Sequence, residues 1–383
     1  MIKKPFRILF FLILFVLLLP VVFNEDLLNI FSSRVSKKKY SLVPGINRYL
    51  IKQVTKRGPV VINVLEIDLA NKNIKLKTGL SDENKLKSRS TLSEITAKYM
   101  AFAAINANYF DKEGAPIGTV ISDKKWLVGP ILNRASIGIS LNDEIFFDQI
   151  MFQGSLNVSR GFFKKKPVFS LALNCLNSPP NLCMGINLIN SNWDKKVKLP
   201  KGKVAYLVRH GCVKKKDKRM IKLNHGDYIL AGSNATKINE IKKRDYIKIN
   251  RKGSSTWDMV SEAVCGGPFL LMDGKVFIDE REENINFGEE NKYAPRSAIG
   301  INPEERKLFL IAVDGRQKDY SVGLSLKELA EVLKRLRVKD AINLDGGGST
   351  TLIAAGRVLN KPSDGHERKI SNGILVFLKE KDN

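Results

Sequence analysis

The sequence predicts an α+β (mixed α/β) protein in which mixed sheets are flanked by helices and the chain closes with a strand–helix–strand unit. Residues 60–69 (VVINVLEIDL) alternate apolar and polar side chains, as a half-buried strand does. Residues 307–316 form a buried apolar run, and residues 325–337 repeat apolar side chains at helical spacing before a further apolar run at 340–353. A length of 383 residues, with 43% hydrophobic and 27% charged residues, excludes a disordered chain and permits a sizeable core.

The first 24 residues predict an N-terminal signal anchor or a signal peptide. Basic side chains precede an apolar run from Ile8 to Phe23, the order that keeps the basic end in the cytoplasm. As a helix this run extends about 24 Å, slightly less than the ~30 Å hydrocarbon core of a bilayer. No small-residue cleavage site follows it, which favours an uncleaved anchor in the inner membrane. The rest of the chain is then expected outside the cytoplasm, which argues against nucleic acid as a partner.

The chain after the apolar run is divided into a stalk and one domain. Residues 25–59 are polar and basic and are interpreted as a stalk, so the domain is predicted over 60–383. Residues 73–80 are expected to pair with the first strand as a hairpin. Thr91 and Glu94 have the spacing of a capping box and predict the start of a short helix.

A basic, β-rich insertion is predicted over about 150–255. The formal net charge of the chain is +25, and residues 160–252 hold 23 Lys and Arg against 5 Asp and Glu. Such a segment favours an anionic partner, such as an anionic envelope polymer or acidic lipid; a lysine-rich solvated face is the alternative. Cys175 and Cys183 bracket a short loop with two prolines, so they either form a disulfide or stay as free thiols.

The C-terminal strand–helix–strand unit places an Asp-Gly pair after each strand. The first strand ends at Asp314 and the second at Asp345, and the helix between them starts with a Ser325–Glu328 capping box. If the two strands are parallel, the crossover brings both aspartates to the same rim of the sheet. Ligands of open α/β sheets bind at that rim, so the unit predicts a site there.

The segment after the second strand (DGGGSTT) is unusual, because a turn rarely needs three glycines. It offers a run of backbone N–H groups beside hydroxyls and next to a carboxylate, which suits a phosphate or a sugar. A glycine-rich turn without a ligand is the alternative. The candidate residues here are Asp345, Gly346, Gly347, Gly348, Ser349 and Thr350.

Other candidates stand alone in the sequence. Arg296, just before a strand, is either a solvated side chain or a guanidinium fork for phosphate or carboxylate. Asn106 and Asn108 either bind a ligand or shape a turn. Neither a zinc spacing nor a GxSxG motif occurs, so a zinc site and a Ser-His-Asp hydrolase are not expected, and no metal or cofactor is assigned to the reaction.

Several of these segments together resemble the phosphodiester glycosidase family. The family includes the enzyme that removes N-acetylglucosamine from a phosphodiester, and many bacterial members are exopolysaccharide biosynthesis proteins. The resemblance covers about 60–150 and 255–380; Ala107 and Asn108 depart from it by replacing glycines. The segments that carry it, in order, are INANYF, GGPFL, RSAIGI, VDGR, LSLKELAEVL, NLDGGGSTT and LNKPSDGHERKISNGI.

The resemblance implies a mixed α/β core, a glycan or sugar-phosphate substrate, and in some members a structural calcium ion. It implies that two sets of residues form the site. Those expected to line it are Asn106, Arg296, Asp314, Arg316, Asp345, Gly347, Gly348, Ser349 and Thr350, and those expected to buttress it are Asn360, Asp364 and Arg368.

These features predict a hydrolase of a glycosyl-1-phosphodiester linkage in a bacterial cell envelope, with the domain periplasmic or extracellular. Arg296 and the 346–350 loop would bind the phosphate, and Asp345 or Asp314 would act as base or nucleophile. A non-catalytic glycan-binding or polysaccharide assembly factor, or a glycosyl-phosphate transferase, would use the same residues and remain alternatives.

Overall fold

The protein is described here by a computed structural model. The predicted signal anchor at residues 1–24 lies outside the described residues. Among the described residues, no helix is both long enough and apolar enough to cross a bilayer. The described residues are 35–150, 153–161, 166–233, 236–252, 257–283 and 291–379.

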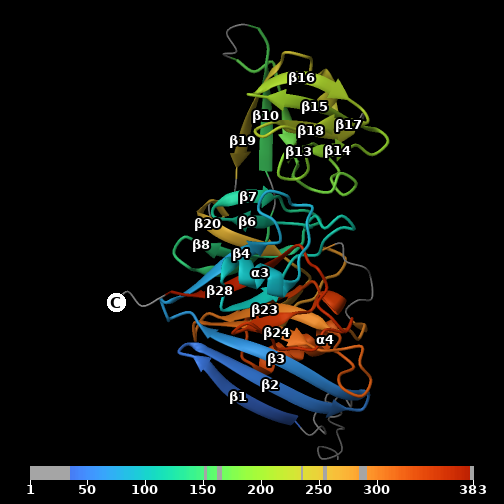
Figure 1. Cartoon of the computed structure of the whole chain (residues 1–383). Helices are drawn as coiled ribbons and strands as arrows, with labels where there is room; N and C mark the ends of the chain where they lie inside the picture. Colours follow the sequence, from blue (N-terminus) through green and yellow to red (C-terminus); the bar gives the residue numbers. More distant parts are fainter. Residues whose placement is uncertain are drawn as a thin grey trace, which may run out of the picture.

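The molecule is built from β-sheets, so the predicted α+β class is wrong (Figure 1). The described residues hold two α-helices, α3 (Leu92–Tyr99) and α4 (Leu326–Arg335), and both begin at the capping boxes that the sequence predicts. The helices do not form a layer of their own, because each covers a small part of one sheet. The sheets instead bury their apolar faces against each other.

The first sheet has eight strands in the order β1-β2-β3-β24-β23-β25-β21-β22. Both β24 and β25 pair antiparallel with β23, so β24 and β25 run parallel to each other with β23 between them. Helix α4 makes the crossover and buries its apolar side chains on this sheet. The strands are β1 (Val35–Val43), β2 (Ile46–Thr55), β3 (Gly58–Asp68), β21 (Phe269–Met272), β22 (Lys275–Val276), β23 (Arg296–Asn302), β24 (Lys307–Val313) and β25 (Asp340–Leu344).

The stalk predicted over 25–59 does not hold for residues 35–55, which form β1 and β2. The first seven residues of β1, VSKKKYS, are exposed, because β1 is the edge strand of the sheet. Lysines are common on edge strands, where they oppose pairing with other chains. A strand with polar side chains on both faces lacks the alternation that identifies strands in a sequence, which is why it was interpreted as a stalk.

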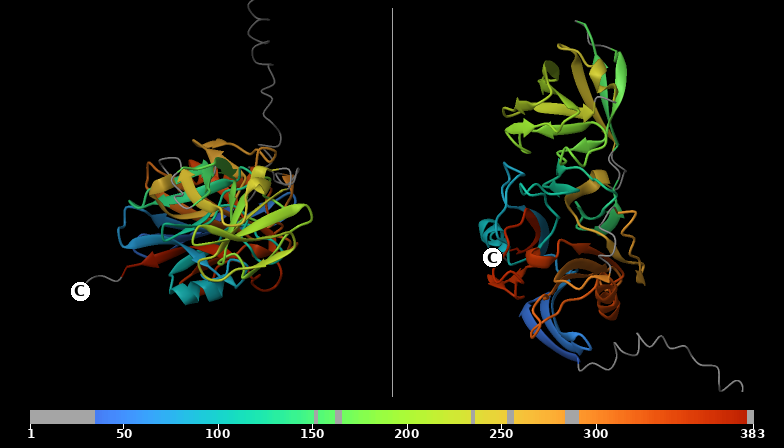
Figure 2. Two further views of the ribbon diagram at one scale, coloured as in Figure 1. Left: turned by 90° about the horizontal axis from the view of Figure 1, so that it is seen from above. Right: turned by 90° about the vertical axis from the view of Figure 1, so that its right-hand side faces the viewer.

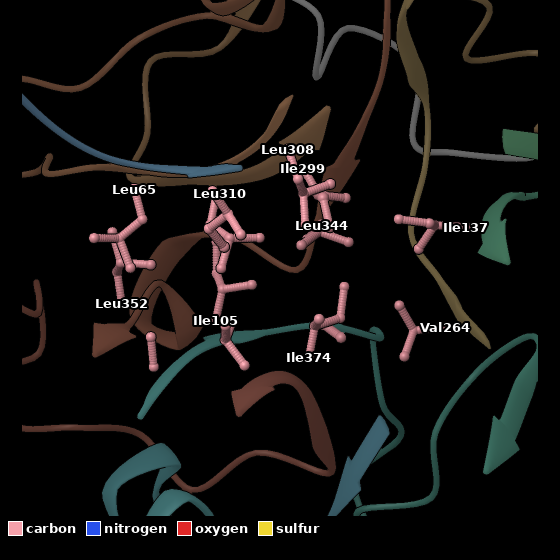
Figure 3. Packing of buried hydrophobic residues seen from close by; sticks show 14 of the residues in the cluster. Leu65, Ile105, Ile137, Val264, Ile299, Leu308, Leu310, Leu344, Leu352 and Ile374 are labelled. Atoms are coloured by element: carbon pink, nitrogen blue, oxygen red, sulfur yellow. The ribbon is translucent and has the colours of Figure 1, made fainter. Parts of the chain in front are cut away.

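A second sheet, in the order β27-β26-β5-β28-β4, packs on the first and encloses the main core. Figure 3 shows Leu65, Leu310 and Leu344 of the first sheet facing side chains of the second. The strand predicted over 73–80 forms as β4, but it pairs with β28 and not with β3. The strands are β4 (Ile74–Leu80), β5 (Ala103–Asn106), β26 (Leu352–Ala354), β27 (Arg357–Val358) and β28 (Asn372–Leu378).

A third sheet, in the order β7-β6-β20-β8-β9, lies between these two sheets and the insertion (Figure 1). Its apolar residues continue the main core, and Trp257 closes it on the side of the insertion with Phe146 packed edge-on. The strands are β6 (Val120–Ser122), β7 (Lys125–Val128), β8 (Ala135–Ser140), β9 (Ile145–Gln149) and β20 (Val260–Cys265).

The described residues between 153 and 252, within the predicted insertion, form a β lobe. Its eight-stranded sheet shares no strand with the other sheets, and Figures 1 and 2 show it at the end of the molecule opposite to β1 and β2. Of the two states that the sequence leaves open for Cys175 and Cys183, the structure has the disulfide. The sheet runs β11 (Phe169–Leu173), β10 (Gln153–Ser159), β19 (Tyr246–Lys252), β16 (Cys212–Asp217), β15 (Lys203–Arg209), β18 (Tyr228–Ser233), β13 (Asn187–Asn190) and β12 (Cys175–Leu176), and β14 (Lys196–Lys198) and β17 (Met220–Lys222) form a separate ribbon.

The register of the first sheet brings three distant parts of the chain to one rim. Arg296, the first residue of β23, pairs with Val313 at the end of β24. The next residue of β23 pairs with Leu344 at the end of β25. Asp314 and Asp345 therefore follow directly on either side of Arg296, as the parallel crossover predicts.

Removing the first two strands tests their contribution to stability. A chain that begins at residue 58 loses β1 and β2 and with them the buried side chains of Ile46 and Ile51. Each buried isoleucine contributes about 2–3 kcal/mol, so we expect a thermal midpoint lower by roughly 10 °C or more. Circular dichroism melting against a chain that begins at residue 35 measures this. Equal midpoints would mean that the two strands are dispensable.

Candidate functional site

A cavity of about 300 Å³ opens at the rim where the three strand ends meet. Its walls carry a marked excess of positive charge. The cationic residues that line it are Arg134, Lys292, Arg296, Arg316 and Arg368, and Asp345 is the one acidic residue among the described lining residues. Tyr109, Asn343, Gly346 and Gly347 add aromatic, amide and backbone surface.

Asp345 follows β25 and stands at the cavity wall. Burial raises the pKa of its carboxyl to about 6, although the Ser349 hydroxyl and the guanidinium groups of Arg368 and Arg134 oppose the rise. The group is therefore held near the point at which it can lose or accept a proton at neutral pH. That is the property required of a general base.

Each of the three positions after Asp345 requires glycine for a different steric reason. A Cβ on Gly346 would lie 2.8 Å from the carbonyl oxygen of Pro295. Gly347 has a φ of +63°, which other residues rarely adopt. A Cβ on Gly348 would lie 2.1 Å from Nη2 of Arg368, which forms an ion pair with Asp364. Pro295, Arg316 and Arg368 therefore all approach the backbone of the glycine run closely.

The backbone N–H groups of this run are mostly used inside the protein. Gly347 N–H donates to the Pro295 carbonyl, Ser349 N–H to that of Gly346, and Thr350 N–H to that of Gly347. The predicted cradle of N–H groups therefore has few donors left for a ligand. Gly346 and Gly347 line the cavity, whereas Gly348, Ser349 and Thr350 lie buried behind it.

Arg316 lies over the glycine run with its side chain exposed. Its guanidinium is so close to Gly347 that a Cβ there would lie 3.1 Å from Nη2. None of the described residues accepts a hydrogen bond from this guanidinium. Its five N–H donors are thus available to an anion in the cavity.

Arg296 lines the cavity, but part of its guanidinium is already engaged. The side chain is 6% exposed, and its Nε–H donates to the carbonyl of Leu324 at 3.1 Å. Its Nη2 donates to the carbonyl of Lys292. Arg296 therefore holds the backbone of two loops at the rim and contributes its charge to the cavity. The fork that the sequence predicts for phosphate is not fully free.

Arg134 is a site residue that sequence reasoning missed. It precedes β8, lines the cavity, and places its guanidinium 4.9 Å from the ring centre of Tyr109. Its Nε and Nη1 atoms are buried and have no hydrogen-bond partner among the described residues. Buried, unpaired N–H groups of a cation are costly, so they indicate a place for an anionic or polar ligand. No motif surrounds Arg134; only the neighbouring Tyr109, within INANYF, gave a signal.

Tyr109 and Asn343 form a polar floor that was not predicted. Nδ2 of Asn343 donates to Oη of Tyr109 at 2.8 Å and to the carbonyl of Gly267 at 3.1 Å. The Asn343 side chain is 1% exposed, and its Oδ1 has no partner among the described residues. This oxygen is an acceptor that suits a hydroxyl or amide N–H of a sugar.

Glu283 is a carboxyl that was not predicted, and it lies behind this floor. Its two oxygens accept hydrogen bonds from the backbone N–H groups of Ala135 and Phe269. Burial raises the pKa of Glu283 to about 7, with the nearby Arg134 opposing the rise. Its backbone contacts fix the start of β8, next to Arg134, relative to β21 across the cavity.

The predicted residues Asn106 and Asn108 do not line the cavity. Asn106 Nδ2 donates to the carbonyl of Asp345, and its Oδ1 accepts from Ser297 and Thr351. Asn108 exchanges hydrogen bonds with Asn372 and with the backbone of neighbouring loops. Both are buried and hold the rim loops in place.

Asp314 also lies outside the cavity, although the sequence marks it as a catalytic candidate. It is 1% exposed, and its carboxylate accepts from the Lys361 backbone N–H at 2.7 Å and from the Tyr320 hydroxyl at 3.2 Å. Burial raises its pKa to about 6. These contacts make Asp314 an anchor for the segment that follows residue 359.

That segment buttresses the glycine run, as the resemblance implies. Asn360 donates to the Thr350 carbonyl and accepts from the Leu352 N–H. Asp364 holds Arg368 through two hydrogen bonds to one carboxylate oxygen. Arg368 itself reaches the cavity wall, so it is both a support and a lining residue.

The described part of the chain contains no group of three or more His, Cys, Asp or Glu that could hold a metal ion. The structural calcium ion therefore stays an expectation drawn from the resemblance. The carboxylates discussed above are engaged by backbone N–H groups, hydroxyls or guanidinium groups.

Comparison with known proteins finds a family similar to part of this chain. Residues 202–377 match the model of the phosphodiester glycosidase family. N-acetylglucosamine-1-phosphodiester alpha-N-acetylglucosaminidase from Mus musculus is 35% identical over 112 residues, and the Homo sapiens protein of that name is 34% identical over 112 residues. Each match covers 27% of this chain and 21% of the relative, so the chain matches about a fifth of the length of these relatives.

Solved structures agree with the fold over most of the chain. A protein from Synechocystis superposes with a TM-score of 0.79 at 22% identity, covering 90% of this chain and 64% of its own. A protein from Burkholderia pseudomallei superposes with a TM-score of 0.68 at 20% identity, covering 83% of this chain and 74% of its own. At these identities the likeness shows the fold alone. The family match over residues 202–377 and the curated relatives support assignment of this part of the chain to the phosphodiester glycosidase family.

Proposed function

We propose that the protein hydrolyses a glycosyl-1-phosphodiester of the N-acetylglucosamine-1-phosphate type, in an envelope glycan or exopolysaccharide outside the cytoplasm. The observation that carries this proposal is the cavity in which five cationic residues surround one carboxylate of raised pKa. The family match supports a glycosyl-phosphodiester hydrolase. The sugar, the linkage and the location are our inference.

The charge of the cavity suits a phosphodiester better than a neutral glycan. A phosphodiester is an anion, and the unengaged guanidinium of Arg316 and the unpaired N–H groups of Arg134 offer it charge-assisted hydrogen bonds. These contacts strengthen as the leaving phosphate gains charge in the transition state. The Oδ1 of Asn343 remains for a substituent of the sugar.

Asp345 is the group placed to activate water. As a carboxylate it takes a proton from a water molecule, whose oxygen forms a bond to the anomeric carbon. The bond between that carbon and the phosphate oxygen breaks, and its electron pair leaves with the phosphomonoester. Because a phosphate is already a good leaving group, a strong general acid is less necessary than at an ordinary glycosidic bond.

The position of the Asp345 carboxyl in the wall of a cationic cavity argues for catalysis over simple binding. A protein that only held a phosphodiester would gain affinity by replacing this carboxylate with a neutral residue, because the carboxylate repels the ligand. A glycosyl-phosphate transferase would use the same groups with an acceptor hydroxyl in place of water. Turnover with and without an added acceptor separates these alternatives.

The Cys175–Cys183 disulfide supports a location outside the cytoplasm. Disulfides persist in oxidising compartments and are rare where glutathione keeps thiols reduced. An N-terminal anchor in the inner membrane, as the sequence predicts, is consistent with this location.

Replacing Asp345 tests its role directly. Asp345→Asn keeps the shape of the side chain but removes the base, so we expect hydrolysis of an N-acetylglucosamine-1-phosphate diester to fall by about 10³ or more. Release of free N-acetylglucosamine is the measurement, and the anomeric configuration of the sugar that the wild type releases, read by NMR, shows whether water or Asp345 attacks first. Inversion supports a base and retention a nucleophile.

The control for this variant is Asp319→Asn, which removes an exposed carboxylate near the rim and should leave the rate unchanged. Asp345→Asn should also keep its thermal midpoint at pH 7 or raise it, because burial disfavours the ionised carboxylate in the folded state. Full activity in Asp345→Asn would contradict the proposed mechanism.

Replacing Arg134 tests the residue that the sequence did not reveal. Arg134→Gln removes a buried cation from the cavity and should lower kcat/KM by about 10². Arg134→Lys restores the charge without the guanidinium fork and should recover part of this loss. Steady-state kinetics beside Arg337→Gln, an exposed arginine far from the rim, measures the effect. A similar loss in both glutamine variants would show that only net charge matters.

The pH dependence of kcat/KM should report the carboxyl of Asp345. Its pKa of about 6 predicts that kcat/KM falls as the pH drops below about 6, because the base becomes protonated. The positive charge of Arg134 lowers the pKa of Asp345, so the acidic limb of the pH profile should move to higher pH in Arg134→Gln. A His366→Gln variant is the control, and it should leave the pH profile unchanged. A limb that moves with His366 would contradict the assignment.

A further inference from the structure

We propose that a second cavity, between the β lobe and the core, is an accessory subsite for a sugar-phosphate chain, so that the substrate is a polymer. This inference rests on the proposed function. The cavity has a volume of about 430 Å³. The lobe contributes Trp193, Lys196 and Lys198 to its walls, and the core contributes Lys87, Asp111 and Glu113.

Nearly all acidic residues of the lobe already form ion pairs. Of the five acidic residues between 160 and 252, four hold a cation in an ion pair. Most of the lysines of the lobe therefore have no acidic partner within it, and their charge is available to an external anion. The pairs are Arg160–Asp245, Arg209–Asp227, Lys215–Asp217 and Lys87–Asp194.

The ribbon of β14 and β17 brings two of these lysines, Lys196 and Lys198, to the cavity wall, with Lys222 beside them on the ribbon. Lys196 lies directly opposite Lys222 in the register, and Lys198 shares their exposed face. Like charges directly opposite on neighbouring strands are destabilising. The described residues provide no ion pair for any of the three. An arrangement that costs stability and holds cations together at a cavity is explained by an anionic ligand.

The remaining wall suits the sugar units of such a ligand. Trp193 is fully buried, and its Nε1 has no hydrogen-bond partner among the described residues. Lys87 lies 5.6 Å from the ring centre of Trp193 and bridges Glu113 and Asp194. Carboxylates accept hydrogen bonds from sugar hydroxyls but repel closely spaced phosphates. A wall with both signs therefore favours a chain that alternates sugars and phosphates over a nucleic acid or an anionic membrane.

One short segment of the core borders both cavities. Tyr109 lines the cavity at the rim, and Asp111 and Glu113 line the cavity beneath the lobe. Two residues span at most ~7 Å of chain, so the two cavities approach each other closely along this segment. We place the route of a bound chain from the subsite towards Asp345 along this segment.

The test compares one polymeric and one minimal substrate. The double variant Lys196→Gln/Lys198→Gln removes two charges from the ribbon, and Lys52→Gln/Lys56→Gln removes two exposed charges from the opposite end of the molecule (Figure 1). The substrates are an oligomer of phosphodiester-linked N-acetylglucosamine 1-phosphate and the methyl diester of N-acetylglucosamine 1-phosphate. For the ribbon variant we expect a KM for the oligomer that is roughly tenfold higher, with kcat unchanged.

The minimal substrate should behave alike in all three proteins. An equal loss on both substrates, or no loss on either, would overturn the subsite. Binding of a fluorescent oligomer to the same variants, measured by anisotropy, decides the matter even where nothing is hydrolysed, so failure of the proposed function is distinguishable. Tighter binding to single-stranded DNA, or to vesicles rich in anionic lipid, would overturn the choice of ligand.

Discussion

The site depends on the antiparallel pairing of β23 with both β24 and β25. Because β23 begins where its two neighbours end, Arg296 enters the sheet between Asp314 and Asp345. The guanidinium of Arg296 then fastens the loops on either side through their carbonyl oxygens. A slip of one residue in this register would turn every side chain of β23 to the opposite face. The rim is therefore fixed by the same hydrogen bonds and apolar contacts that hold the core.

The rim divides its polar groups between support and chemistry. Asn106, Asn360 and Asp314 are buried, and their hydrogen bonds end on the backbone of the rim loops. Asp345 and Arg134 line the cavity instead, and the Nε and Nη1 groups of Arg134 are buried without a partner among the described residues. Such costs are tolerated in a folded protein where a ligand offsets them. The polar groups that face the cavity, and not those bonded to the backbone of the rim loops, therefore identify the reactive part of the site.

Much of the rim was predictable from the sequence, because both capping boxes, the crossover and the glycine run are local patterns with physical causes. The sequence could not distinguish Asp314 from Asp345, since both follow a buried strand and precede a glycine. Only the tertiary structure shows that the segment at Lys361 covers Asp314. Arg134 and Lys292 reach the cavity from loops without any motif, so their function depends wholly on folding. The α+β class failed because short and edge strands with many lysines, such as β1, lack the alternation by which strands are recognised.

The lobe is placed against the core by more than its covalent connections. Gln153 pairs with Lys252, so the insertion leaves and rejoins the core through two adjacent strands, which alone would permit bending at that neck. A second set of contacts lies away from the neck: the backbone N–H of Leu86 donates to the Asn192 carbonyl, and apolar side chains of both parts share one cluster. Two separated attachments fix an orientation that one would leave free. The lysine ribbon consequently keeps a constant position relative to the segment that leads to Asp345, which a subsite for a continuous polymer requires.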